Sequence, residues 1–324
     1  ASENFGVLRL RRNVFNPRSY VGGMVTSRIN TEGDENYAYG FDGIINVFGE
    51  DFLRVNLAQS QDSEDSANLD PLDRARVYVQ WQNRQSLGFG YTFSYSNVGS
   101  DYNPGLGFER RFDFSEFSGE LGYLYFLPDE ASLRTLEYSL TGTTSIGNSS
   151  GTMETRQINN RLVLNWDRGN SLGLNARYLI DRVPKAFRLS DEIEIAAVEY
   201  ENTEFSIDYS TAAVGLLLSN FNVTIGKFYG GDMYSATIAP EVVASKFFQF
   251  TAFYQYSNIN FVDLDQTFES HLARVKASVT FNVKWSIATI AQLNSLSEIT
   301  AINMRLRYNP VDGNDLYLVY NEGI

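Results

Sequence analysis

The stretch Leu87-Gly88-Phe89-Gly90-Tyr91-Thr92-Phe93-Ser94-Tyr95 decides the fold class, because a large hydrophobic residue occupies every second position. The residues between them are glycine, threonine and serine. Successive side chains of a β-strand point to opposite faces of a sheet. The stretch therefore predicts a strand with one oily face and one face of small or polar residues.

The same alternation recurs along the chain and predicts roughly 18 strands joined by turns. The expected strands lie near residues 5–13, 19–28, 37–48, 52–60, 74–83, 86–97, 114–127, 133–143, 152–166, 171–181, 199–210, 213–226, 232–242, 246–258, 268–282, 284–294, 299–308 and 314–321. Turn-forming sequences such as Asn16-Pro17 and Pro310-Val311-Asp312-Gly313 fall between them. No segment offers the roughly 20 predominantly apolar residues that a membrane helix needs.

The composition describes a folded protein and excludes several functions. The chain has 324 residues, 43% of them hydrophobic, with no cysteine, one histidine and a formal net charge of −13. No linker-like stretch divides it, so we expect residues 1–324 to form a single domain. The absence of cysteine excludes disulfides and thiolate chemistry. The acidic balance argues against a nucleic-acid partner, since phosphate binding needs clustered Lys and Arg.

Many long strands with one apolar face must place that face away from water. A soluble β protein turns it into a core, whereas a membrane barrel turns it toward lipid. Aromatic residues such as Tyr37, Trp81, Tyr95, Trp285 and Tyr308 lie toward strand ends, where an interfacial girdle needs them. We therefore expect an all-β, transmembrane antiparallel β-barrel of about 16 to 20 strands, best counted as 18. Such a barrel belongs in the bacterial outer membrane, surrounded by lipid and lipopolysaccharide; a soluble protein with an aromatic core is the alternative.

Four stretches resemble the bacterial domain-of-unknown-function 5916 family, in its C-terminal region. They are Gly6-Val-Leu-Arg-Leu-Arg-Arg12, Asn103-Pro-Gly-Leu-Gly-Phe-Glu-Arg-Arg-Phe-Asp-Phe114, Gly226-Lys-Phe-Tyr-Gly230 and the ending from Leu306 to Glu322. The resemblance implies the barrel portion of a longer precursor. Members usually carry an N-terminal carbohydrate-binding-like module of the family-nine type, which is missing here. Glu109 stands where the family usually has an apolar residue.

The polar faces supply candidate pore-lining residues. If these faces point inward, the lumen displays Arg76, Arg161, Arg177, Arg274, Lys276, Arg305 and Arg307, with Asp42, Glu120 and Asp208 as counter-charges. An excess of inward arginines biases a pore toward anionic solutes. Alternatively, these charges pair across neighbouring strands and only fill the lumen.

A long loop between the strands expected over 86–97 and 114–127 contains Asn103, Glu109, Arg110 and Arg111. A long loop there can fold into a barrel as a constriction or plug, with the arginines holding acidic groups. Alternatively, the loop only caps a strand and its glycines serve the turn.

Catalytic and cofactor signals are weak. His271 stands alone, no Gly-x-Ser-x-Gly elbow occurs, and phosphate loops and zinc signatures are absent from the sequence. Acidic loop clusters lack the spacing of an EF-hand, so we expect no metal site and no cofactor.

The sequence thus favours a porin-like channel or substrate-uptake barrel, connected with carbohydrates through the missing module. The alternatives are a plugged membrane anchor that holds a binding module or partner protein, and an outer-membrane hydrolase.

Overall fold

The computed structural model describes residues 2–63, 70–85, 87–128, 130–212, 217–296 and 299–323. Within these ranges the regular structure is β-strand, apart from one single-turn 3-10 helix, Val262–Leu264. No helix of the described residues is long and apolar enough to cross a membrane. The all-β prediction is confirmed.

Eighteen strands belong to one sheet, which confirms the predicted count. They are β1 (Glu3–Asn13), β2 (Tyr20–Asn30), β3 (Glu35–Phe48), β4 (Asp51–Asp62), β5 (Ala75–Asn83), β6 (Gly88–Val98), β7 (Phe114–Phe126), β8 (Leu133–Gly147), β9 (Met153–Trp166), β10 (Ser171–Arg182), β13 (Glu199–Ser210), β14 (Leu217–Phe228), β15 (Gly231–Ser245), β16 (Phe248–Phe261), β17 (Gln266–Thr280), β18 (Trp285–Asn294), β19 (Ile299–Val311) and β20 (Asn314–Gly323). The strand expected over 213–226 begins with four residues that lie outside the described part. Two further short strands, β11 (Phe187–Arg188) and β12 (Glu194–Ile195), form a separate hairpin.

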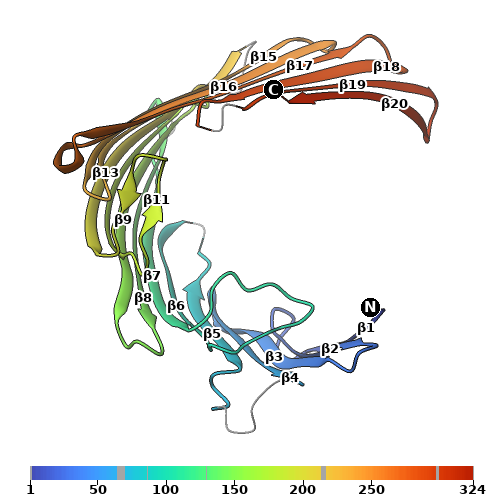
Figure 1. Ribbon diagram of the computed structural model, residues 1–324, viewed down its shortest axis with the longest axis vertical. Helices are drawn as coiled ribbons and strands as arrows, with labels where there is room; N and C mark the ends of the chain where they lie inside the picture. The colour runs from blue at the N-terminus through green and yellow to red at the C-terminus, as the bar shows by residue number, and fades with distance from the viewer. Residues whose placement is uncertain are drawn as a thin grey trace. The chain divides into compact units, whose positions relative to one another are not determined.

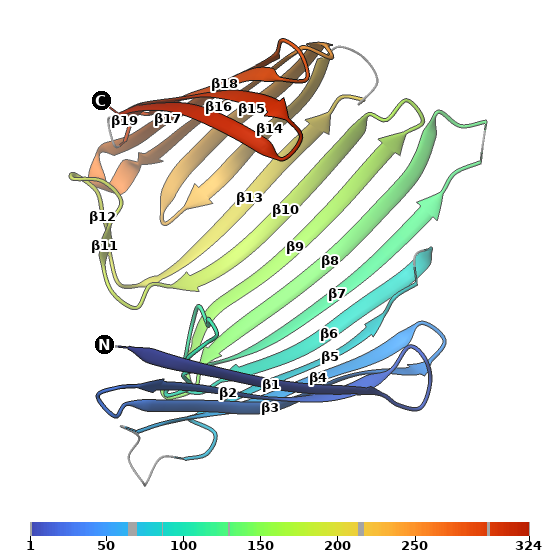
Figure 2. The ribbon, with the colours of Figure 1, turned by 90° about the vertical axis from the view of Figure 1, so that its right-hand side faces the viewer.

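The strands follow one another in chain order, each antiparallel to the next, from β1 to β7 and from β13 to β20. Figures 1 and 2 show these strands side by side. By contacts the chain groups into two compact units, one made mainly of residues 1–124 and the other mainly of residues 183–324. This order is the up-and-down topology that hairpin connections produce.

The expected alternation of faces is present in the described strands. In β6, the rings of Phe89, Tyr91, Phe93 and Tyr95 follow one another on one face, with adjacent centroids of the first three about 6 Å apart (6.0 and 5.9 Å). Tyr95 packs against Phe117 of β7 at 4.9 Å. Many of the large apolar side chains on this face are exposed, and Phe93 remains 50% accessible.

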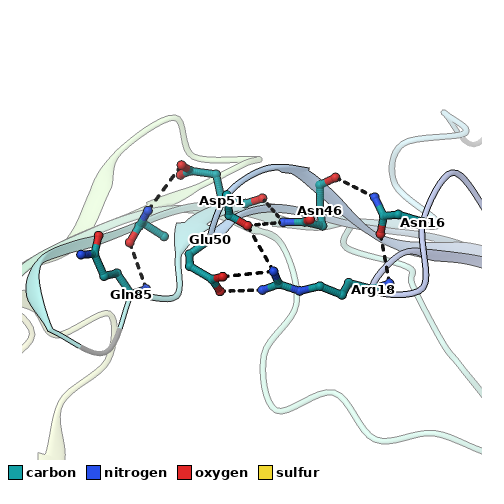
Figure 3. Close-up of polar contacts among 8 residues, drawn as sticks. Asn16, Arg18, Asn46, Glu50, Asp51 and Gln85 are labelled. Carbon is teal, nitrogen blue, oxygen red and sulfur yellow. Dashed lines mark hydrogen bonds and ion pairs between the residues drawn. The ribbon is translucent and has the colours of Figure 1, made fainter.

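Polar contacts join the hairpin turns after β1, β3 and β5 (Figure 3). Asn16 donates to the Asn46 carbonyl at 3.2 Å, and Arg18 donates to both carboxylate oxygens of Glu50. The ring of Phe52 is 2% accessible, with the guanidinium of Arg18 4.7 Å from its centroid. A second guanidinium, that of Arg84, lies 4.1 Å from the same centroid. These contacts fix one end of β1 to β6 in register.

Two prolines lie inside strands, and for Pro310 this contradicts the prediction. Pro310 was expected in a turn, but β19 continues to Val311 through an irregularity in its register with β20. Pro240 lies within β15, where the pairing with β16 is interrupted between Ile238 and Glu241. Proline has no N–H to donate, so both positions occur where the ladder is broken.

The connection from β10 to β13 carries the hairpin of β11 and β12 and forms the main buried cluster among the described residues. Val183, Ile193 and Ile195 pack with Ile259 and Phe261 of β16. Ile259 shares the face of Ser257, because alternate residues of a strand point the same way. The connection therefore covers one end of the polar face of its own unit.

Candidate functional site

The polar face of β1 to β5 is built from rows of residues that the strand register places side by side. One row runs Arg9, Met24, Gly40, Ala58 and Arg76. Its two arginines stand at the ends; between them, Gly40 and Ala58 are small and Met24 is a larger apolar side chain. A Cβ on Gly40 would lie 2.4 Å from the Leu57 carbonyl oxygen, so this position admits no larger residue without a shift of the backbone. Between its two guanidinium groups the row forms a shallow part of the polar face, and we call this row the floor.

A second row beside it contains Asp42, Asn56 and Tyr78. Asp42 accepts a hydrogen bond from Arg9 at 2.8 Å. Asp42 was predicted as a counter-charge on the polar face. Its partner is Arg9, which was not among the predicted residues. The alternation Leu8, Arg9, Leu10, Arg11 is the signal that could have placed Arg9 on the polar face.

The segment 99–113 between β6 and β7 folds back against this face. Figure 1 shows it in green beside β3, β4 and β5. The amide of Asn103 donates to the hydroxyl of Ser60 at 2.8 Å, and the Asn36 side chain donates to the Asn103 carbonyl at 2.9 Å. Ser60 and Asn36 are 1% and 7% accessible. Buried polar groups are costly unless they are bonded, so these two contacts hold the segment on the strands.

Two ion pairs hold the second half of the segment on the strands. Glu109 accepts from Arg76 at 2.8 Å, and Arg111 pairs with Glu154 of β9. Arg110 is exposed, and no ion pair joins it to any other described residue. The structure thus brings Asn103, Glu109 and Arg111 into contact with the strands and leaves the Arg110 side chain pointing to solvent. The segment lies against the polar face of the strands, and its role as a constriction or plug stays a prediction.

A cavity of about 680 Å³ lies between the floor and the segment. Arg54 lines it from β4, and Tyr102, Leu106 and Phe108 line it from the segment. Tyr102 is 7% accessible, and burial raises the pKa of its phenol. The cavity is therefore lined by charges of both signs on one side and by apolar and aromatic side chains on the other.

In the other unit, the predicted charges around β9, β10 and β13 pair with one another. Arg161 lies 3.6 Å from Asp208, and Arg177 donates to Glu204. Gly173 of β10 contributes no side chain between Arg161 and Asp208; a Cβ there would lie 3.4 Å from both. At these positions the charges neutralise one another across neighbouring strands.

Farther along the same unit, β17 and β19 carry cations without such partners. Arg274, Lys276 and Arg305 form no ion pair with another residue in the described ranges, and Arg305 instead stacks 3.9 Å from the ring centroid of Tyr317. Arg307 is paired with Asp315 at 2.7 Å. Glu120 of β7 likewise has no ionic partner in the described part of its own unit. The predicted pore-lining set therefore divides into paired and unpaired members.

His271 lies on the apolar face of β17, opposite Tyr256. Its Nδ1 is 2.8 Å from the Tyr254 hydroxyl, and its Nε2 is 3.3 Å from a Glu269 oxygen. The hydroxyl of Ser295 binds the His271 backbone amide and not its ring. The arrangement does not join a serine to the imidazole, as a catalytic triad requires.

No protein-family model matches the chain, and no curated protein sequence is similar to it. Among solved structures, it is similar to Pseudomonas aeruginosa OccK1 (OpdK), with a TM-score of 0.45 and 11% identity over 99% of this chain and 97% of that chain. A second structure, OpdK with vanillate, gives the same values. At this level of similarity, neither likeness assigns a ligand or a function to the chain.

Proposed function

We propose that the chain is an outer-membrane barrel that acts as a porin-like uptake channel, with lipid and lipopolysaccharide around its apolar face. The observation that carries this proposal is the division of the strands into two faces of opposite character. Phe41, Phe93 and Phe117 are at least half exposed on one face (73%, 50% and 53%). A contiguous apolar surface of this kind is stable in lipid and not in water.

The polar face supports the channel part of the proposal. It carries arginines, carboxylates and small side chains, the lining that water-filled barrels have. Segment 99–113 lies on this face and narrows the space above it without filling it, since the cavity of about 680 Å³ remains. Loops that fold inward in this way restrict which solutes pass.

Planar-bilayer conductance of the purified full chain tests the proposal. We expect steady single-channel currents with a preference for anions, and the Arg305→Gln variant to reduce that preference because Arg305 has no ionic partner in the described part of the chain. The control is Arg168→Gln, which removes the same charge from the exposed turn between β9 and β10. A protein that purifies without detergent as a soluble monomer contradicts the membrane location, and the absence of current contradicts the channel.

Segment 99–113 also supports a second candidate, a membrane anchor whose lumen is plugged. This function predicts no conductance, together with co-purification of a partner protein. The two candidates thus differ in the same bilayer experiment.

A further inference from the structure

We propose that the cavity between segment 99–113 and the polar face of β1 to β5 binds a small organic anion with one negative charge and an apolar body, and that the Arg54 guanidinium contacts the anion. The inference deepens the proposed uptake function, on which it rests for its biological meaning.

The balance of charge around the cavity predicts the charge of the ligand. Five charged side chains line it: Arg9, Asp42, Arg54, Arg76 and Glu109. Two pairs, Arg9 with Asp42 and Arg76 with Glu109, are each closed at 2.8 Å. Arg54 is left without a carboxylate among the described residues, and its guanidinium carbon lies 5.6 Å from the Tyr78 ring centroid. One uncompensated guanidinium fits one carboxylate, which it can bind with two parallel hydrogen bonds.

The other wall of the cavity predicts an apolar body. Leu106 and Phe108 are 38% and 85% accessible, although both are large and hydrophobic. Met24 faces them from the floor, where Gly40 and Ala58 leave room because they are small. A ligand that covers Leu106 and Met24 removes apolar surface from water, which stabilises the complex in addition to the ionic contact.

The position of Arg54 places the anion at the side of the cavity away from Arg76. In the register, Arg54 pairs with Ile44 and Gln80, while Arg76 pairs with Ala58, four residues farther along β4. A ligand held at Arg54 can therefore lie along the floor toward Arg76 and Glu109 without breaking their ion pair.

Benzoate is a suitable probe, because it combines one carboxylate with an apolar ring. We would titrate it into the purified full chain in a nonionic detergent and measure the Kd by ligand-detected NMR, with benzamide as the neutral analogue of the same shape. Loss of a charge-assisted hydrogen bond is expected to weaken benzoate binding about 10- to 150-fold in Arg54→Gln, and Arg54→Lys is expected to restore part of it. The matched control is Arg274→Gln, which removes a guanidinium that has no ionic partner in the described ranges and lies outside the cavity.

Each outcome supports or overturns the site. Selective loss of benzoate binding in Arg54→Gln, with benzamide weak throughout, supports it. Equal affinity for benzoate and benzamide overturns the anion contact. A loss of benzoate affinity in Arg274→Gln equal to that in Arg54→Gln overturns the location. Tighter binding of glucose than of benzoate overturns the ligand class in favour of a sugar. The binding site and the channel function can fail independently. Benzoate binding without bilayer current supports the site and contradicts the channel function. Bilayer current without benzoate binding supports the channel function and contradicts the site.

Discussion

Gly105→Ala should release segment 99–113 from the strands, because Gly105 is the point of closest approach. Its φ is +60°, and a Cβ there would lie 1.9 Å from the Asn36 side-chain oxygen. A residue with a side chain in this left-handed region costs about 1–2 kcal/mol. Moving Asn36 also breaks its hydrogen bonds to the Asn103 carbonyl (2.9 Å) and to Asp62 (2.7 Å), at about 1 kcal/mol each.

The sum, about 3–4 kcal/mol, corresponds to a roughly 150- to 1000-fold rise in the local opening equilibrium. Hydrogen exchange of the Asn103 amide, which is bonded to Ser60, measures this opening directly. The control is Gly49→Ala, since Gly49 has a φ of +51° and a Cβ added there would meet no atom within 4 Å. Both variants carry the backbone strain, but only Gly105→Ala should accelerate exchange at Asn103. Unchanged exchange at Asn103, or equal acceleration in both variants, would refute the proposed docking of the segment.

Two further predictions concern the turn end of β1 to β6. Phe52→Ala should lower the free energy of unfolding by about 3–5 kcal/mol in a urea titration, because the ring is buried between two guanidinium groups. The control Phe15→Ala should change the free energy of unfolding by less than about 0.5 kcal/mol, since Phe15 is 88% exposed. Equal losses in the two variants would contradict the packing. The Arg18 guanidinium lowers the pKa of Glu50 below its ordinary value of 4.5, so the pair stabilises the fold above about that pH and its contribution is lost as the pH falls through the lowered pKa. An NMR titration should show this pKa rising in Arg18→Gln, and an identical pKa in both proteins would contradict the pairing.

The strands could be predicted because their signal is local. A period of two needs only neighbouring residues, and the expected strand over 199–210 has the same bounds as β13. The ends of other strands were less well predicted: β8 continues four residues beyond the expected position 143, to Gly147. Strand ends depend on pairing with the next strand, which a local pattern does not contain.

The candidate site could be predicted only in part, because its contacts are long-range. Arg76 and Glu109 were each singled out for their charge and position, but their pairing joins residues 33 positions apart. The pairing of Arg9 with Asp42 spans the same separation. The hairpin of β11 and β12 was not predicted, since strands of two residues have no periodicity to detect. What a sequence pattern supplies here is the face on which a side chain lies, while its partner depends on how a connection folds back.

Glu109 shows how such a connection can determine the chemistry of the face it covers. Its carboxylate holds segment 99–113 to β5 through Arg76, and the same contact neutralises one of the three guanidinium groups around the cavity. An apolar residue at position 109 would leave Arg76 as a second cation without a partner and would also remove an anchor of the segment. Charge and access are therefore coupled through one side chain: a change that favours more highly charged anions would at the same time loosen the segment that limits their entry.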